Sequence, residues 1–125
     1  MTENEISYLI RGAIFKVYNA LGPGLLESAY EAVLIYELIH MGLTVISQQA
    51  VPLIYCGEKI DVAYRLDLLV EDKVFVEIKS VSVLTEVHHL QLLTYLRLSG
   101  KKLGLLVNFN TDDIGKSIFR KVNKL

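Results

Sequence analysis

Three ionisable residues stand close together in the middle of the chain, in a pattern that could hold a metal ion. Asp67 lies near the end of one apolar segment, and Glu77 and Lys79 lie two residues apart in the next, VFVEIKS. Carboxylate and carbonyl oxygens suit Mg²⁺, which needs few protein ligands because it retains several waters. A lysine beside such a cation could stabilise the charge that develops on a scissile phosphate. The pattern therefore permits phosphodiester chemistry, with Asp67, Glu77 and the backbone carbonyl of Ile78 as metal ligands.

The register of the two segments decides whether these side chains meet. We expect strands over 59–70 and 74–80, and side chains alternate between the two faces of a strand. If Val70 pairs with Val74, Asp67 lies opposite Glu77 on the same face, whereas a slip of one residue would separate them. We expect the matching register because it also places one set of apolar residues together in the core: Val62, Leu66, Val74, Val76 and Ile78.

Two carboxylates that face each other on a sheet repel, so local stability does not explain them. A divalent cation between them does. The simpler alternative is a salt bridge within the hairpin, between Lys79 and either Asp67 or Glu77, because this spacing of acids and a lysine is a weak pattern in a strand-rich chain.

Another acid, Glu27, follows a break at Gly22-Pro23-Gly24, near the beginning of a helix expected over 25–41. An acid in the first turn favours the helix dipole by about 0.3–1 kcal/mol, which is sufficient to account for Glu27. In GLLESAY, however, Gly24, Glu27 and Tyr30 recur at three-residue spacing, which places Glu27 and Tyr30 on neighbouring positions of one face. If this end of the helix points at the hairpin, Glu27 is a third carboxylate.

A later helix, expected over 86–99, carries a stripe of hydrogen-bonding groups. His88, Gln91 and Tyr95 fall at i, i+3 and i+7, where a helix that packs on a sheet usually presents Leu or Val. Gln91 and Tyr95 could orient Lys79, a carboxylate or a phosphate. The alternative is a buried polar pair with its hydrogen bonds satisfied.

The composition sets limits on the class of protein. The chain has 125 residues, 52% of them hydrophobic, and a formal net charge of -1, which excludes an overtly polybasic nucleic-acid binder. Residues 101–125 nevertheless carry six bases and two acids, a net charge of +4. This end is either a solvated charged segment or a surface that steers phosphates, whose candidate residues are Lys101, Lys102, Lys116, Arg120 and Lys121. The single cysteine, Cys56, can form no internal disulfide.

The hydrophobic periodicity predicts one domain, over residues 1–125, of mixed α/β (α+β) class. We expect two helices, over 3–21 and 25–41, then three strands, over 43–55, 59–70 and 74–80. The helix over 86–99 then crosses over to a buried strand over 102–108, and residues 114–122 form either a short helix or an edge strand. Pro52 favours an edge position or a bend for the first strand. In the two N-terminal helices, we expect these residues on the apolar sides: Ile6, Ile10, Ala13, Val17, Leu21, Leu26, Ala29, Tyr30, Val33 and Leu38.

The segment Gly24-Leu25-Leu26-Glu27-Ser28-Ala29-Tyr30 resembles the signature of the small bacterial and archaeal GxxExxY proteins, which are grouped with the PD-(D/E)xK nuclease superfamily. The resemblance covers nearly the whole chain and implies a restriction-endonuclease-like core with a mixed central sheet flanked by helices. The metal-binding acid of that superfamily falls on Asp67, its (D/E)xK on Glu77-Ile78-Lys79 and its helix acid on Glu27. Its Q-x-x-x-Y helix falls on Gln91 and Tyr95, and Leu66 stands where the superfamily has a proline.

The resemblance implies a Mg²⁺- or Mn²⁺-dependent nuclease that hydrolyses DNA or RNA. The catalytic residues would be Glu27, Asp67, Glu77, Lys79, Gln91 and Tyr95, supported by Gly24, Tyr30 and His88, with Glu27 as a further metal ligand. The alternative is a non-catalytic module with this fold that binds nucleic acid or protein, or a dimeric scaffold. A homodimer or a partner protein could complete the groove. We expect no membrane span and a reduced cytoplasmic compartment, since MTENEISYLI lacks the features of a signal peptide.

Overall fold

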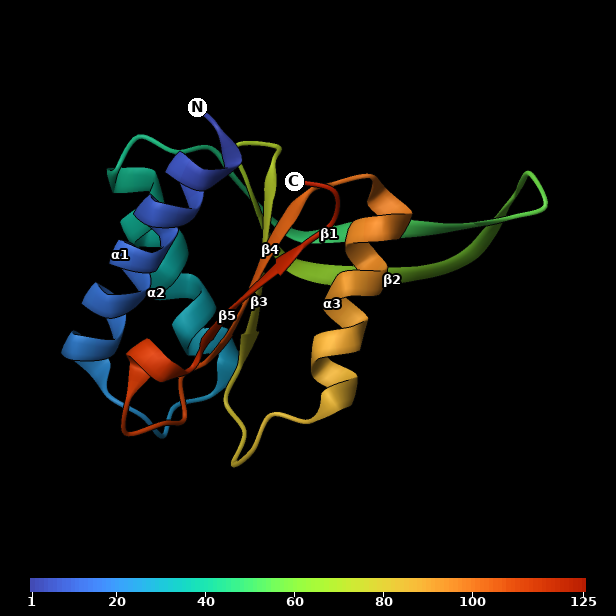
Figure 1. Ribbon diagram of the computed structural model, residues 1–125. Coiled ribbons are helices and arrows are strands. Elements are labelled where there is room, and N and C mark those ends of the chain that lie inside the picture. Colours follow the sequence, from blue (N-terminus) through green and yellow to red (C-terminus); the bar gives the residue numbers. More distant parts are fainter.

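Figure 1 shows a computed structural model of residues 1–125, which describes the side chains of residues 1–60 and 64–125. The helices are α1 (Glu3–Leu21), α2 (Glu27–His40) and α3 (Glu86–Ser99). The strands are β1 (Val45–Tyr55), β2 (Glu58–Val70), β3 (Val74–Lys79), β4 (Leu103–Asn108) and β5 (Ile118–Val122). A short 3₁₀ helix, η1 (Ile114–Lys116), precedes β5, so the C-terminal segment forms both a helical turn and an edge strand. The predicted order of elements is confirmed.

The strands form one five-stranded sheet in the order β1-β2-β3-β4-β5. Only β3 and β4 are parallel, because α3 carries the chain from the end of one to the beginning of the other. In Figure 1, α1 and α2 lie on one side of the sheet and α3 lies on the other. Each face therefore has its own hydrophobic core, and β4, between them, is buried along its whole length. This is the mixed α+β architecture that a restriction-endonuclease-like core requires.

A side-chain cap fixes the beginning of α1, whereas α2 begins without one. Thr2 caps α1, because its Oγ1 accepts from the N–H of Glu5 at 3.2 Å. The expected apolar stripe of α1 is buried except for its last residue, Leu21, which is 38% exposed. In α2, Leu26 was expected on the apolar side, but it precedes the helix and is 78% exposed. The helix begins one residue later and buries Tyr30 and Leu38, as expected, together with Leu34, whereas Ala29 and Val33 are only half-buried.

The regular alternation of β2 breaks at Asp67, which makes one prediction about the core wrong. Leu68 packs under α1 and α2 with Val74, whereas Leu66 packs under α3. Leu66 and Leu68 both pair with β1, but the ladder has no pair for Asp67, opposite which Gln48 has a φ of 54°. A left-handed residue in the neighbouring strand bends the ladder here. The side chain of Val62, expected in the same core, lies outside the described residues.

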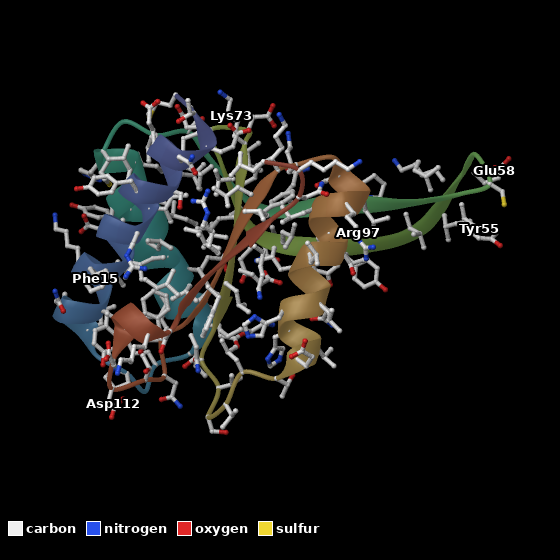
Figure 2. All side chains as sticks on the ribbon, in the orientation of Figure 1. Phe15, Tyr55, Glu58, Lys73, Arg97 and Asp112 are labelled. Carbon is white, nitrogen blue, oxygen red and sulfur yellow. The ribbon has the colours of Figure 1, made fainter. Side chains whose placement is uncertain are left out.

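Beyond this bend, β1 and β2 continue as a long hairpin that projects from the body of the molecule (Figure 1). Tyr55 and Glu58 lie at its tip (Figure 2), where Cys56 is also exposed. The pairing shifts between Val51 and Leu53, at Pro52, and β1 is an edge strand, so both expectations for Pro52 are confirmed. Among the described residues, no helix has the length and apolar character that a membrane span requires.

Candidate active site

Asp67 and Glu77 meet at the open end of the β2–β3 hairpin. The register is the predicted one, with Val70 opposite Val74 and Leu68 opposite Val76. Beyond that last pair, each carboxylate accepts a hydrogen bond from the backbone of the opposite strand. Glu77 Oε1 accepts from the N–H of Asp67 at 3.2 Å, and Asp67 Oδ2 accepts from the N–H of Ile78 at 2.7 Å. These two bonds fix both carboxylates in place, although their negative charges repel.

The surroundings of Glu77 favour its neutral form. Its side chain is 8% exposed and lies on the α3 face of β3, which it shares with Phe75. Burial, followed by the negative charge of Asp67 and a hydrogen bond with its side chain, raises the pKa of Glu77 to about 8. The charge of Lys79 acts in the opposite direction. A cation bound by both carboxylates would offset the repulsion between Asp67 and an ionised Glu77. The electrostatics of the site therefore favour the binding of a cation.

Lys79, the last residue of β3, is half-buried on the same face as Glu77. Its backbone carbonyl is tied to the N–H of Phe109 at 2.9 Å, which fixes the strand end. The described side chains form three ion pairs, Lys16–Glu37, Lys101–Asp72 and Lys116–Asp113, all away from this site. The hairpin salt bridge that was the simpler alternative is therefore not among them. The ammonium of Lys79 remains available to a ligand.

The turn before α2 explains the glycine and the tyrosine of the GLLESAY segment. Tyr30 is fully buried and stacks on Phe109, with ring centroids 4.3 Å apart. Its hydroxyl donates to the carbonyl of Gly22 at 2.6 Å and accepts from the N–H of Leu25 at 3.2 Å. Gly24 has a φ of 102°, which a residue with a side chain rarely adopts. Both residues thus hold the turn in shape and do not face the carboxylate pair.

The same turn places Glu27 beside the end of β3. Glu27 Oε1 accepts from the N–H of Ser80 at 3.2 Å, and Ser80 Oγ donates to the carbonyl of Leu25 at 2.7 Å. Glu27 is exposed and is hydrogen-bonded to Ser80, the residue after Lys79, so the helix end does point at the hairpin. The structure nevertheless does not join Glu27 to the Asp67–Glu77 pair, because its carboxylate is engaged by the Ser80 backbone.

Glu31, one turn after Glu27, is the acid of α2 that lies beside Asp67, and the sequence analysis missed it. The amide of Gln48 donates to both carboxylate oxygens of Glu31, at 3.1 and 3.2 Å, and to Asp67 Oδ1 at 3.3 Å. Burial raises the pKa of Glu31, and the charge of Asp67 raises it further. The four-residue spacing from Glu27, which keeps both acids on one helix face, is the signal that could have identified it.

The three polar residues of α3 have different surroundings: Tyr95 and Gln91 lie on the side of the carboxylates, and His88 lies at the beginning of the helix. Tyr95 is buried near Glu77, since burial and then the charge of Glu77 raise the pKa of its hydroxyl. Its ring packs on Tyr64 of β2, with centroids 5.1 Å apart, and the exposed Gln91 lines a pocket of about 200 Å³ beside both rings. His88, in contrast, accepts from the N–H of Thr85 at 3.1 Å, which caps α3. Tyr95 therefore lies in the core on the Glu77 side of the sheet, and His88 supports the fold.

The basic residues of the C-terminal segment do not form one surface. Lys101 pairs with Asp72 at 3.1 Å, and Lys116 lies 3.9 Å from Asp113 in the η1 loop. Arg120 and Lys121 are consecutive in β5 and point to opposite faces, Arg120 toward Asn4 of α1 and Lys121 toward α3. Their partners, Asp72 and Asp113, are the sequence neighbours of Lys73 and Asp112. Figure 2 shows Lys73 and Asp112 at opposite ends of the molecule, so the two ion pairs lie far apart. Lys102 lies by a separate pocket.

The residues at the hairpin fit a hard divalent cation through two carboxylates. No group of three or more His, Cys, Asp or Glu side chains among the described residues is arranged around one metal position. Mg²⁺ does not need such a group, because water and substrate oxygens complete its octahedron. The N–H of Ile78 points toward Asp67, and the carbonyl of a strand residue points to the same side as its N–H. Asp67, Glu77 and the Ile78 carbonyl thus form an all-oxygen donor set.

Comparison with known proteins adds one match. The family model described as the PD-(D/E)XK nuclease superfamily matches residues 4–121, nearly the whole chain. No curated protein and no solved structure matches the sequence or the fold. The matched range includes the Asp67–Glu77 pair, Lys79, both acids of α2 and the polar residues of α3.

Proposed function

Because this chain belongs to the PD-(D/E)XK nuclease superfamily, we propose that it hydrolyses phosphodiester bonds of DNA or RNA with the help of a divalent cation. The observation that carries the proposal is the pairing of the half-buried Asp67 with the buried Glu77, beside a lysine with no ion-pair partner among the described residues. Once both carboxylates are ionised, such a pair does not stabilise a hairpin that holds no cation.

Asp67, Glu77 and the carbonyl of Ile78 would hold the cation, and its donor set of hard oxygens favours Mg²⁺ or Mn²⁺. When bound, such a cation supplies a Lewis acid that polarises a phosphoryl oxygen and favours the ionised form of water. The protein must first release the proton that Glu77 binds, because its pKa is raised to about 8 without a cation. Cation binding and activity should therefore both increase as pH rises.

Lys79 would contact the reacting phosphate. Its ammonium lies on the same face as Glu77 and can stabilise the negative charge that builds up on a phosphoryl oxygen during the reaction. Tyr95 packs in the core on the Glu77 side of the sheet and would support that carboxyl, while the exposed amide of Gln91 would offer a hydrogen bond to the substrate. Glu27 and Glu31 line the α2 side and would position water or the cation from there.

The proposal is tested by incubating single- and double-stranded DNA and RNA with the protein in Mg²⁺, in Mn²⁺ and in chelator. Asp67→Ala and Lys79→Ala are the site variants, and Asp112→Ala and Lys16→Ala are matched controls because both residues are exposed and lie away from the site. Metal-dependent cleavage by the wild type and by the controls, lost in both site variants, supports the proposal. Absence of cleavage on every substrate, or equal cleavage by the site variants, contradicts it.

A further inference from the structure

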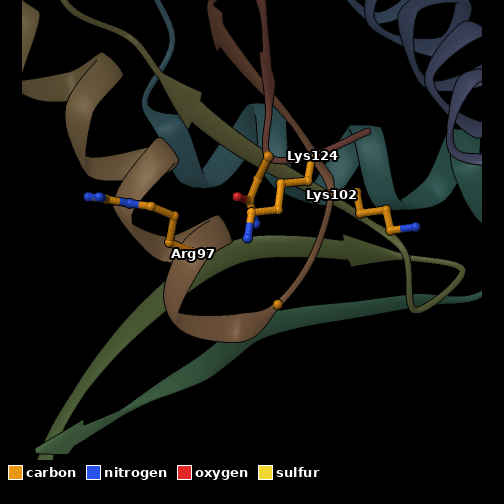
Figure 3. Close-up of a pocket in the computed structure, with 5 residues that line it drawn as sticks. Arg97, Lys102 and Lys124 are labelled. Carbon is orange, nitrogen blue, oxygen red and sulfur yellow. The ribbon is translucent and has the colours of Figure 1, made fainter.

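A pocket with cationic side chains lies at the C-terminal end of α3, outside the carboxylate site. A pocket of about 430 Å³ opens there, and its lining residues come from the end of α3, from the loop before β4 and from the segment after β5 (Figure 3): Arg97, Gly100, Lys102, Asn123 and Lys124. Three of these residues are cationic at neutral pH, and none is acidic. An anion is therefore the class of ligand that this pocket suits.

The three cations are not required to stabilise the end of the helix. The carbonyls there already have donors, since Leu96 accepts from Ser99 Oγ at 3.2 Å, and the amide of Asn123 donates to Leu96 and Lys101. Lys101, a fourth base nearby, is paired with Asp72. Arg97, Lys102 and Lys124 have no carboxylate partner in the three ion pairs of the described side chains. Their charge is available to an external ligand.

The pocket suits an extended polyanion better than one small anion. In Figure 3 the side chain of Arg97 extends away from the side on which Lys102 and Lys124 lie, so the cationic groups do not converge on one point. The C-terminal end of a helix also carries partial negative charge, which weakens the binding of a lone anion. Separated cations can instead contact successive phosphates of a nucleic-acid backbone.

The sheet relates this pocket to the carboxylate pair. Lys102 immediately precedes Leu103, which pairs with Val74, and Glu77 lies three residues further along β3. The offset from Lys102 to Glu77 is thus four strand positions, about 13 Å at 3.3 Å per residue. Lys102 and Glu77 also share the α3 face of the sheet, by alternation with Leu106 and Phe75. Because α3 covers the sheet between these two points, the strand would pass outside the helix, and a duplex strand covers that offset in about four base steps of 3.4 Å.

We propose that the pocket formed by Arg97, Lys102 and Lys124 binds backbone phosphates of the nucleic acid about four steps from the bond held at Asp67 and Glu77. The inference rests on the proposed function for the identity of the polyanion. Phosphates bound at this end of α3 would fix the position of the nucleic-acid strand relative to the two carboxylates. The inference also assigns a role to Arg97, which lies outside the basic C-terminal segment, and places it with Lys124 of that segment.

The test measures oligonucleotide binding in chelator, where no cleavage occurs, across a range of salt concentrations. Arg97→Gln with Lys102→Gln removes one arginine and one lysine from the pocket. Arg11→Gln with Lys16→Gln removes the same two charges from α1, on the opposite side of the sheet. We expect the pocket variant to weaken binding about tenfold at low salt and to reduce the slope of log affinity against log salt by about 1.4–1.8, while the α1 variant leaves the slope unchanged.

Arg97→Lys with Lys102→Arg keeps both charges and should retain the wild-type slope. Inorganic phosphate, added at constant ionic strength, should not displace the oligonucleotide; displacement would identify a site for small anions and overturn the proposal. An equal loss of slope in both double variants would also overturn it. The proposed function is judged separately, from cleavage in Mg²⁺ by the wild type and Asp67→Ala, so either proposal can fail alone.

Discussion

The backbone N–H of Asp67 donates a hydrogen bond to the side chain of Glu77, and the N–H of Ile78 donates one to the side chain of Asp67. Two acids on adjacent strands are thereby held together where the ladder ends, each by the backbone of the other strand. When Glu77 is ionised, the two negative charges repel at this point of the sheet. The loss of stability on ionisation of Glu77 and the binding of a cation by the pair are both measurable.

The first prediction concerns pH. The pKa of Glu77 is raised from its ordinary value of 4.5 to about 8, so between these values the folded state binds more protons than the unfolded state. Its contribution to stability is full below about pH 4.5 and is lost as pH rises through 8. In chelator, the free energy of unfolding should therefore fall from pH 5.5 to 8.5 by about 2–4 kcal/mol more in the wild type than in Glu77→Gln. Urea denaturation at both pH values measures this difference. An equal fall in the free energy of unfolding for the two proteins would contradict the raised pKa of Glu77.

The second prediction concerns the cation. A ligand present at a hundred times its Kd stabilises the folded state by about 2.7 kcal/mol, which raises the melting temperature of a domain of this size by several degrees. Mg²⁺ or Mn²⁺ should do so for the wild type at pH 8, and much less for Asp67→Asn or Glu77→Gln. Ca²⁺ and an equal ionic strength of NaCl are the controls. A shift of the same size in the two variants would place the cation elsewhere.

The third prediction concerns the turn that carries Glu27. Tyr30→Phe removes the donor to the Gly22 carbonyl and the acceptor of the Leu25 N–H while it retains the ring on Phe109. Loss of these buried bonds should cost about 1–3 kcal/mol. Tyr36→Phe is the matched control, since that residue is 58% exposed. Thermal denaturation distinguishes the two, and an unchanged melting temperature for Tyr30→Phe would show that the turn does not depend on the hydroxyl.

The fourth prediction concerns the distance between α3 and the sheet. A Cβ added at Gly104 would lie 3.0 Å from Cδ1 of Leu92, which is fully buried. Gly104→Ala should therefore destabilise the protein by about 1–3 kcal/mol, and Leu92→Val in the same chain should recover part of the loss. Gly12→Ala, with no atom within 4 Å of the new Cβ and a place in α1, should be neutral or slightly stabilising. Equal effects of the two alanine variants would contradict the close packing.

The sequence predicts the hairpin well and its surroundings less well. The short turn between Val70 and Val74 and the alternation of β3 fix the register, so the Asp67–Glu77 pair follows from local rules. The bend at Asp67 does not, because it depends on a left-handed Gln48 in another strand. Glu31 was missed because its place beside Asp67 is set by how α2 is rotated on the sheet, which the sequence pattern leaves open.

The positions of the C-terminal basic side chains could not be predicted from the sequence either. Six bases within 25 residues suggest one charged surface, but an edge strand sends Arg120 and Lys121 to opposite faces. Lys101 and Lys116 are drawn to acids at different ends of the molecule. The pocket at the end of α3 combines Arg97 and Lys102, which are close in the sequence, with Lys124, which follows β5. Only the folded chain brings Lys124 to the other two charges.

The central claim is tested most directly by the single-turnover cleavage rate of the best substrate in saturating Mg²⁺, measured for the wild type, Asp67→Asn and Lys79→Met at pH 8. The account predicts that both variants fold but cleave at least about a hundredfold more slowly, and that Lys79→Met alone retains the stabilisation by Mg²⁺. Cleavage by Asp67→Asn at the wild-type rate would contradict the account.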